Sequence, residues 1–149
     1  MRRAGDKPIS VDPASAEFLR ELGPDKFLAW TRGAAILFPN AEEAAILAGS
    51  DDPETQCARL AAYYPLVVIK RGAAGCEAAA GEKRWRINAP KIEAIDTTGA
   101  GDAFVAAFLS ARLSGADIQP ALERAVAAGA AASASVGGRP KAASVHPDR

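Results

Sequence analysis

The sequence of 149 residues lacks the features of several specialised protein classes. Its 18 Lys and Arg residues balance its 18 Asp and Glu residues, so there is no basic excess with which to bind nucleic-acid phosphates. No segment approaches the roughly 18–20 consecutive apolar residues of a membrane span, and the first residues contain no apolar signal-peptide core. The two cysteines, Cys57 and Cys76, are isolated and too few for a disulfide framework. We therefore expect a cytoplasmic protein with reduced thiols and small-molecule partners, with neither nucleic acid nor membrane among them.

The order of the apolar segments predicts an α/β fold. Short apolar runs at 9–11, 36–38 and 66–69 are typical of buried strands, and the segments between them have the apolar spacing of helices, at 15–33 with a break at 23–24, 40–48 and 52–64. Because parallel strands need crossover connections, this alternation predicts a mostly parallel sheet. The segments 76–80, 84–87 and 91–95 are predicted as antiparallel edge strands, and 101–113 and 118–136 as alanine-rich helices. We expect residues 1–140 to form one domain and residues 141–149 a disordered tail.

One segment carries most of the chemistry: residues 96–104, Asp-Thr-Thr-Gly-Ala-Gly-Asp-Ala-Phe, just before a predicted helix. A glycine-rich turn at a helix N-terminus lets free backbone N–H groups converge on an anion. No GxxxxGK[ST] motif is present, and the helix begins with an acid, Asp102, instead of a lysine. An acid in the first turn also simply stabilises a helix. Beside a bound phosphate, however, a carboxylate is useful as the group that accepts the proton of an incoming hydroxyl.

Two shorter motifs have both a functional and a structural interpretation. Asn40-x-x-Glu43 follows a predicted strand and places a carboxylate where it can help to hold Mg²⁺, but the same pattern is an ordinary helix N-cap followed by an acid. Lys70-Arg71-Gly72-x-x-Gly75 ends another predicted strand, and its glycines allow close backbone approach to a ligand. A simple β-turn explains that motif equally well.

Residues 96–104 resemble the C-terminal signature of the ribokinase-like (PfkB) carbohydrate and nucleoside kinases almost letter for letter, and the two shorter motifs are similar to further elements of that family. The resemblance implies a three-layer α/β/α fold that binds ATP and Mg²⁺. It also implies roles for particular residues: Asp102 as catalytic base; Gly99, Ala100 and Gly101 as the anion hole; Asp96 and Thr98 at a monovalent cation such as K⁺; Asn40 and Glu43 near the metal and phosphates; and Lys70, Gly72 and Gly75 in the nucleotide element.

The resemblance covers only the C-terminal half of the family pattern, so we expect a fold truncated at its N-terminus. The expected function is transfer of the γ-phosphate of ATP to a hydroxyl of a sugar or sugar-like substrate, in association with a separate N-terminal half or in an oligomer. The alternative is a non-catalytic nucleotide-binding or interaction module derived from such a kinase. A third interpretation, an unrelated α/β domain whose Gly-Ala-Gly-Asp merely starts a helix, accounts for fewer of the motifs.

Overall fold

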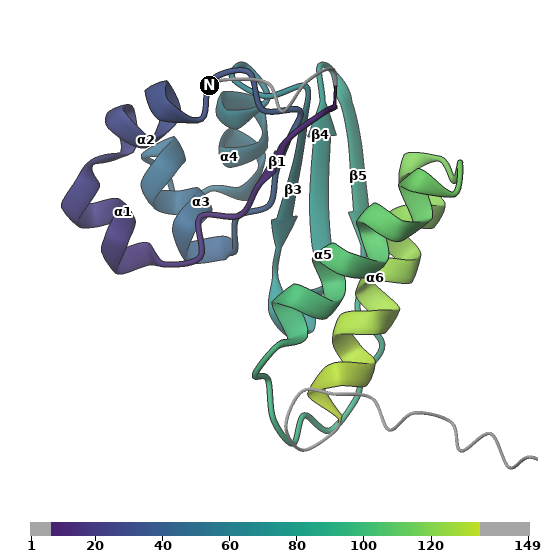
Figure 1. Cartoon of the computed structure of the whole chain (residues 1–149). Helices are drawn as coiled ribbons and strands as arrows, with labels where there is room; N and C mark the ends of the chain where they lie inside the picture. The colour runs from purple at the N-terminus through teal and green to yellow at the C-terminus, as the bar shows by residue number, and fades with distance from the viewer. Residues whose placement is uncertain (1–6, 135–149) are drawn as a thin grey trace, which may run out of the picture. The chain divides into compact units, whose positions relative to one another are not determined.

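The computed structural model describes residues 7–134 of the chain, which divide into two units between Asn88 and Ala89 (Figure 1). The sheet of the first unit contains the strands β1 (Ser10–Val11), β2 (Ile36–Leu37), β3 (Leu66–Lys70), β4 (Cys76–Ala80) and β5 (Lys83–Ile87). Their order in the sheet is their order in the chain. The first three strands are parallel, whereas β4 and β5 pair antiparallel. The prediction of parallel strands followed by antiparallel ones is therefore confirmed.

Four helices gather on one side of this sheet (Figure 1): α1 (Ala16–Leu22), α2 (Pro24–Trp30), α3 (Ala41–Ala48) and α4 (Pro53–Leu60). Side-chain caps fix three of their starts, with Ser15 accepting from the Phe18 amide, Asn40 from Glu43 and Asp52 from Thr55. α1 and α2 are separated at Gly23, whose φ of 87° continues no right-handed helix. The helix starts and the break at Gly23 match the predicted segments, but α2 ends at Trp30 and α4 at Leu60, before the predicted ends at 33 and 64.

The core of the first unit lies between the four helices and the sheet. Large side chains from the helices pack together with alternate residues of the strands, among them Leu19, Phe27, Leu60, Val67 and Ile69. Strand β3 is almost completely buried along its length, as its uninterrupted apolar sequence indicates. The cysteines Cys57 and Cys76 are both buried and free, as expected.

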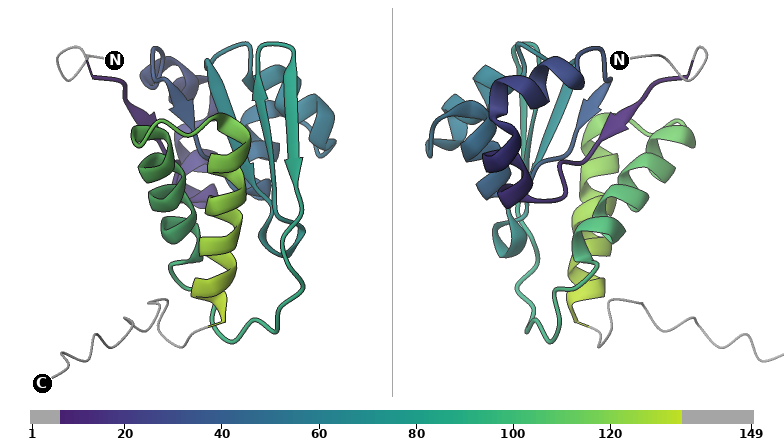
Figure 2. Two further views of the ribbon diagram at one scale, coloured as in Figure 1. Left: turned by 90° about the vertical axis from the view of Figure 1, so that its right-hand side faces the viewer. Right: turned by 60° about the vertical axis from the view of Figure 1, so that its left-hand side comes forward.

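The second unit contains α5 (Ala100–Leu113) and α6 (Ile118–Ser133), which lie side by side (Figure 2). The predicted strand at 91–95 is wrong, because residues 89–99 form an irregular connection. Its apolar residues Ile92 and Ile95 are three apart instead of two, so no single face of a strand would bury both, and both are exposed. The ends of the predicted last helix and of the predicted domain, and the predicted tail at 141–149, lie outside the described residues.

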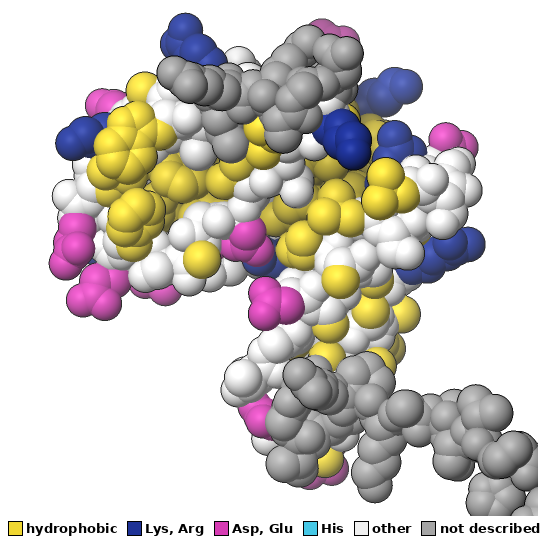
Figure 3. All heavy atoms as spheres, viewed as in Figure 1, with side chains coloured by type: hydrophobic (Ala, Val, Ile, Leu, Met, Phe, Trp, Pro, Cys, Tyr) yellow, Lys and Arg dark blue, Asp and Glu magenta, His cyan; other side chains and the backbone are white. Residues whose placement is uncertain are grey.

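Charged side chains of both signs are interspersed on the face shown in Figure 3, which agrees with the net charge of zero. Apolar side chains also reach the surface, and Phe18, Trp30 and Tyr63 of the first unit are each about half exposed. Within residues 7–134, no helix has both the length and the apolar character needed to cross a membrane.

Candidate active site

The N-terminus of α5 has the geometry of an anion-binding turn. Gly99 precedes the helix with a left-handed φ of 76° and provides no side-chain cap. The first helical hydrogen bond runs from the Ala103 amide to the Gly99 carbonyl (2.9 Å). Gly101 and Asp102 therefore lie in the first turn, whose N–H groups have no acceptor within the helix. Both residues are exposed, so a solvent-borne anion has access to these donors.

Hydrogen bonds from both sides hold the loop that leads into this turn. The Asp96 carboxylate accepts the Thr98 amide (2.9 Å), and the Ala100 amide donates to the Thr97 carbonyl (3.2 Å). The amides of Ile95 and Asp96 both donate to the carbonyl of Ser133, the last residue of α6, at 2.8 and 3.1 Å. The residues predicted to act on phosphate and on a monovalent cation, 96–102, are thus one continuous, internally bonded segment.

In the first unit, the predicted nucleotide residues lie where the parallel strands end. Asn40 lies shortly after β2, and Lys70 is the last residue of β3. The two residues form an isolated parallel bridge, in which the Lys70 amide donates to the Pro39 carbonyl (2.8 Å). The Lys70 ammonium makes an ion pair with Asp12, the residue after β1, at 2.5 Å. Ligands of open α/β sheets bind outside the carboxyl ends of the strands. The structure therefore brings Asn40 and Lys70 together at the expected edge and adds Asp12, which the sequence analysis missed.

Glu43 is bound to its own helix cap. The Asn40 amide donates to a Glu43 carboxylate oxygen (2.8 Å), and the Glu43 amide donates to the Asn40 side chain (2.9 Å), which completes a capping box. Glu43 is only 2% exposed. Burial raises its pKa, and the nearby Asp12 acts in the same direction, while the Asn40 amide and Lys70 oppose the shift. The structural interpretation of Asn-x-x-Glu is therefore confirmed, and the carboxylate still lies beside Lys70 and Asp12.

The predicted Gly72-x-x-Gly75 element is a tight turn between β3 and β4. It contains a short 3-10 helix, η1 (Gly72–Ala74), closed by a hydrogen bond from the Gly75 amide to the Gly72 carbonyl (3.0 Å). Gly72 has a φ of 55° and Gly75 a φ of 93°, and the latter, with a ψ of −125°, is accessible to glycine alone among common residues. The turn interpretation is correct: Gly72, two residues after Lys70, is exposed, whereas Gly75 is buried.

A metal site made by protein groups alone is not present in the part of the chain that the structure describes: no three His, Cys, Asp or Glu side chains are grouped to hold an ion. Glu43 belongs to the first unit, and Asp96 and Thr98 to the second. Mg²⁺ in phosphotransferases is held largely by substrate phosphates and waters, with one or two carboxylates. The residues present fit that type of site and not a closed protein cage.

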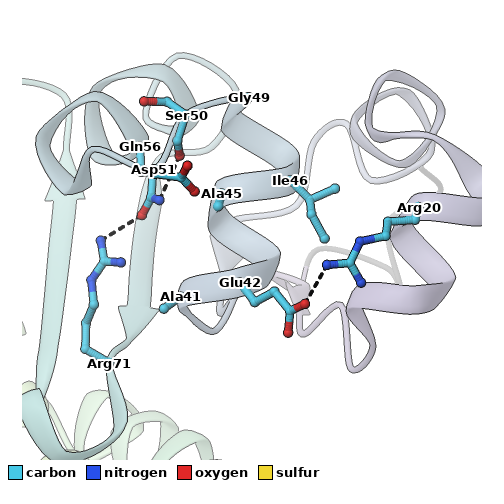
Figure 4. Close-up of a pocket in the computed structure, with 10 residues that line it drawn as sticks. All are labelled: Arg20, Ala41, Glu42, Ala45, Ile46, Gly49, Ser50, Asp51, Gln56 and Arg71. Carbon is cyan, nitrogen blue, oxygen red and sulfur yellow. Dashed lines mark hydrogen bonds and ion pairs between the residues drawn. The ribbon is translucent and has the colours of Figure 1, made fainter.

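A cavity of about 580 Å³ opens beside α3 in the first unit, but none of the predicted site residues lines it (Figure 4). Its two arginines are already paired, Arg20 with Glu42 at 2.5 Å and Arg71 with both Gln56 and Glu77. Burial acts to raise the pKa of Glu77, but hydrogen bonds from Arg86 and Arg71 outweigh it and lower that pKa. With its cations neutralised, the cavity offers no free charge for a phosphate.

Comparison with known proteins identifies the family to which the chain belongs. Residues 1–143 match the pfkB family of carbohydrate kinases. The ribokinase of Bacillus subtilis is 39% identical over 118 residues, which are 78% of this chain and 36% of that protein. A ribokinase II candidate from E. coli, solved in complex with ATP and Mg²⁺, has a TM-score of 0.79 at 30% identity and covers 91% of this chain and 45% of its own.

A fructokinase from Vibrio cholerae O395, solved with fructose, ADP and a calcium ion, has a TM-score of 0.77 at 30% identity over 88% of this chain and 46% of its own. A double mutant of that fructokinase was solved with fructose, ADP and a potassium ion. The chain thus spans less than half the length of each of these relatives and has a ribokinase-like fold over the part that it covers. The match over 1–143 shows that the chain belongs to the pfkB family of carbohydrate kinases.

Proposed function

We propose that this chain is the nucleotide-binding and catalytic half of an ATP-dependent phosphotransferase whose acceptor is a hydroxyl of a sugar or sugar-like molecule. The observation that carries the proposal is the first turn of α5, where free N–H groups and an exposed carboxylate, Asp102, lie side by side behind the left-handed Gly99. A helix N-terminus favours an anion, whereas a carboxylate repels one. Their combination is useful when the carboxylate accepts a proton from the nucleophile and the N–H groups bind the phosphate.

In this proposal the backbone of Gly99, Ala100 and Gly101 stabilises the charge on the transferred phosphoryl group. Asp102 orients the acceptor hydroxyl and accepts its proton late in the reaction. Phosphoryl transfer through a loose transition state requires little prior deprotonation of the nucleophile, so a well-placed carboxylate is sufficient. Catalysis then rests on positioning, because the hydroxyl must lie in line with the bond that breaks.

The first unit contributes to nucleotide binding in the same proposal. Asn40 and Glu43 would lie near the Mg²⁺ and phosphates, and Lys70, Gly72 and Gly75 would contact the nucleotide. When bound, Mg²⁺ neutralises phosphate charge and orients the transferred group. Asp96 and Thr98 would lie at a monovalent cation such as K⁺. The relatives solved with ATP and Mg²⁺, and with ADP and Ca²⁺ or K⁺, support this choice of ligands.

The three-layer α/β/α arrangement and the acceptor site belong to the same proposal. A chain that spans less than half of its relatives needs a further polypeptide segment, or another subunit, to complete the pocket that holds a sugar. We propose that phosphorylation requires such a complement, whereas nucleotide binding does not.

Titration calorimetry of the chain with a non-hydrolysable ATP analogue and Mg²⁺ tests the nucleotide site, with Gly101→Val as the variant that obstructs the turn. Binding by the wild type and its loss in Gly101→Val are expected, because a bulky side chain at 101 crowds the backbone donors. Unchanged affinity in a folded Gly101→Val chain would disprove the anion-hole assignment.

The Asp102→Asn variant separates catalysis from binding. It should retain or improve nucleotide affinity, because a negative charge beside the phosphates is removed, yet it should lose phosphoryl transfer when an N-terminal half from a pfkB-family kinase complements the chain. Undiminished transfer by Asp102→Asn would show that another group is the base. Nucleotide binding without transfer by the complemented wild type would instead favour the non-catalytic module.

A further inference from the structure

We infer that Gly129 of α6 is a positioning residue for the anion-binding turn at the start of α5. The role rests on the proposed function, because it matters for activity only if that turn binds phosphate. The structural part of the inference concerns how α6 holds the segment from Ile95 to Ala100, and it has a test that needs no nucleotide.

The two helices come close together at the first residue of α5. A Cβ atom placed on Gly129 would lie 3.3 Å from the Ala100 carbonyl oxygen and 3.6 Å from the Phe104 Cβ. The first distance is tighter than nine in ten real Cβ contacts, so a side chain at 129 requires the Ala100 backbone to move away by a few tenths of an ångström. Ala100 lies between Gly99 and Gly101, and its displacement would move the donors on both sides of it.

Space, and not backbone conformation, explains the glycine. Gly129 is the single glycine within α6, whose neighbouring positions are mostly alanine. It is absent from the positive-φ residues, so alanine would fit its backbone and would be the better helix former. A residue that is unfavourable for the helix at this position is explained by the close approach of Ala100.

The same end of α6 also holds the beginning of the loop. The Ser133 carbonyl, left without a helical partner at the C-terminus, accepts the amides of Ile95 and Asp96 at 2.8 and 3.1 Å. The Ser133 hydroxyl donates back to the Gly129 carbonyl at 3.0 Å. One helical turn of α6 therefore fixes the segment at both ends, at 95–96 by hydrogen bonds and at Ala100 by contact.

An anion-binding turn is most effective when its N–H donors are already in place. Donors that must first be ordered bind more weakly, because ordering them costs conformational entropy. Substitution at 129 should therefore loosen or shift the turn without unfolding the helix. Gly129→Val adds a bulky side chain against Ala100, and Gly129→Ala adds the smallest one. The matched control is Ala127→Val, which enlarges an exposed position of the same helix.

Hydrogen exchange of the full 149-residue chain, read from peptides that cover 95–102, tests the inference directly. In Gly129→Val these amides should exchange about tenfold faster than in the wild type, while Ala127→Val leaves them unchanged. If Gly129→Val does not fold, the same measurement on Gly129→Ala tests the inference. A smaller acceleration of hydrogen exchange is then expected in the same peptides. Exchange at 95–102 that is identical in the wild type and a folded Gly129 variant would overturn the inference.

Titration with the ATP analogue then tests whether the positioning of the turn by Gly129 affects nucleotide binding. The affinity of Gly129→Val should fall about tenfold, with the circular dichroism spectrum unchanged and with Ala127→Val binding as the wild type does. Faster exchange together with undiminished affinity would overturn the link to phosphate. A wild-type chain that binds no nucleotide would count against the proposed function, while the exchange result would still decide the positioning role.

Discussion

Removal of the Asp12 carboxylate should destabilise the first unit by an amount that the structure allows us to work out. Asp12 accepts two hydrogen bonds, from the Lys70 ammonium at 2.5 Å and from the Ala14 amide at 3.1 Å. The Lys70 side chain is only 15% exposed and that of Asp12 31% exposed, so Asp12→Ala leaves a largely desolvated cation unpaired. We expect about 2 kcal/mol from the ion pair, between exposed and fully buried cases.

A backbone hydrogen bond adds a second contribution to the loss of stability in Asp12→Ala. Ala14 has a left-handed φ of 64°, which is unusual for a residue with a Cβ, and the Asp12 carboxylate stabilises that turn by accepting the Ala14 amide. Loss of the hydrogen bond adds about 1 kcal/mol. The expected decrease in the free energy of unfolding for Asp12→Ala is therefore about 3 kcal/mol in total.

The chain provides a matched control in the exposed pair Arg20–Glu42, which has the same 2.5 Å separation but side chains 57% and 61% exposed. Glu42→Ala should cost under about 1 kcal/mol. Urea unfolding followed by circular dichroism measures both variants. In Asp12→Ala/Lys70→Met the combined loss should be smaller than the sum of the single losses, because the unpaired charge is gone. An Asp12→Ala effect no larger than that of Glu42→Ala would refute the reasoning.

Two further predictions concern the segment from β3 to β4. Burial raises the pKa of the Cys76 thiol to about 12 from 9.0. Because the pKa is higher in the folded state, the contribution to the free energy of unfolding is complete below pH 9 and is lost as the pH rises toward 12. At about pH 11 the loss is about 2–3 kcal/mol, so urea unfolding at pH 8 and 11 should show a smaller decrease in Cys76→Ala than in the wild type, and equal decreases would contradict the burial. Gly75→Ala should cost about 3 kcal/mol and Gly72→Ala about 1 kcal/mol, because the φ of 55° at Gly72 lies in the left-handed region that other residues occasionally adopt, whereas the angles of Gly75 are those of glycine alone; equal costs in urea unfolding would contradict the described turn.

Features that depend on local sequence were predictable. The caps at Ser15, Asn40 and Asp52, the break at Gly23 and the buried strand β3 follow from side-chain chemistry within a few residues. The helix start that presents Asp102 was predictable for the same reason, since a glycine-rich turn followed by apolar residues at helical spacing is a local signal.

Features that depend on distant partners were not predictable in the same way. The sequence Asp12-Pro13 indicates only a turn, and its ion pair with Lys70 joins residues 58 positions apart. The mixture of charged and apolar residues at 91–95 predicts an alternating strand, whereas the Ile95 amide donates to the carbonyl of the distant Ser133. The tight approach of Gly129 to Ala100 is likewise invisible until both helices are placed.

Because strand order agrees with chain order in the first unit, its strands can pair in the order in which they are synthesised. Each strand after β1 pairs with the strand just before it in the chain, so a partner is already present when that strand emerges during synthesis. The segment that carries Asp102 is different, because the carbonyl that anchors residues 95 and 96 belongs to Ser133. The five described strands can therefore be paired on a nascent chain while the turn that carries Asp102 is still unanchored, and the proposed chemistry becomes available only when α6 has been made.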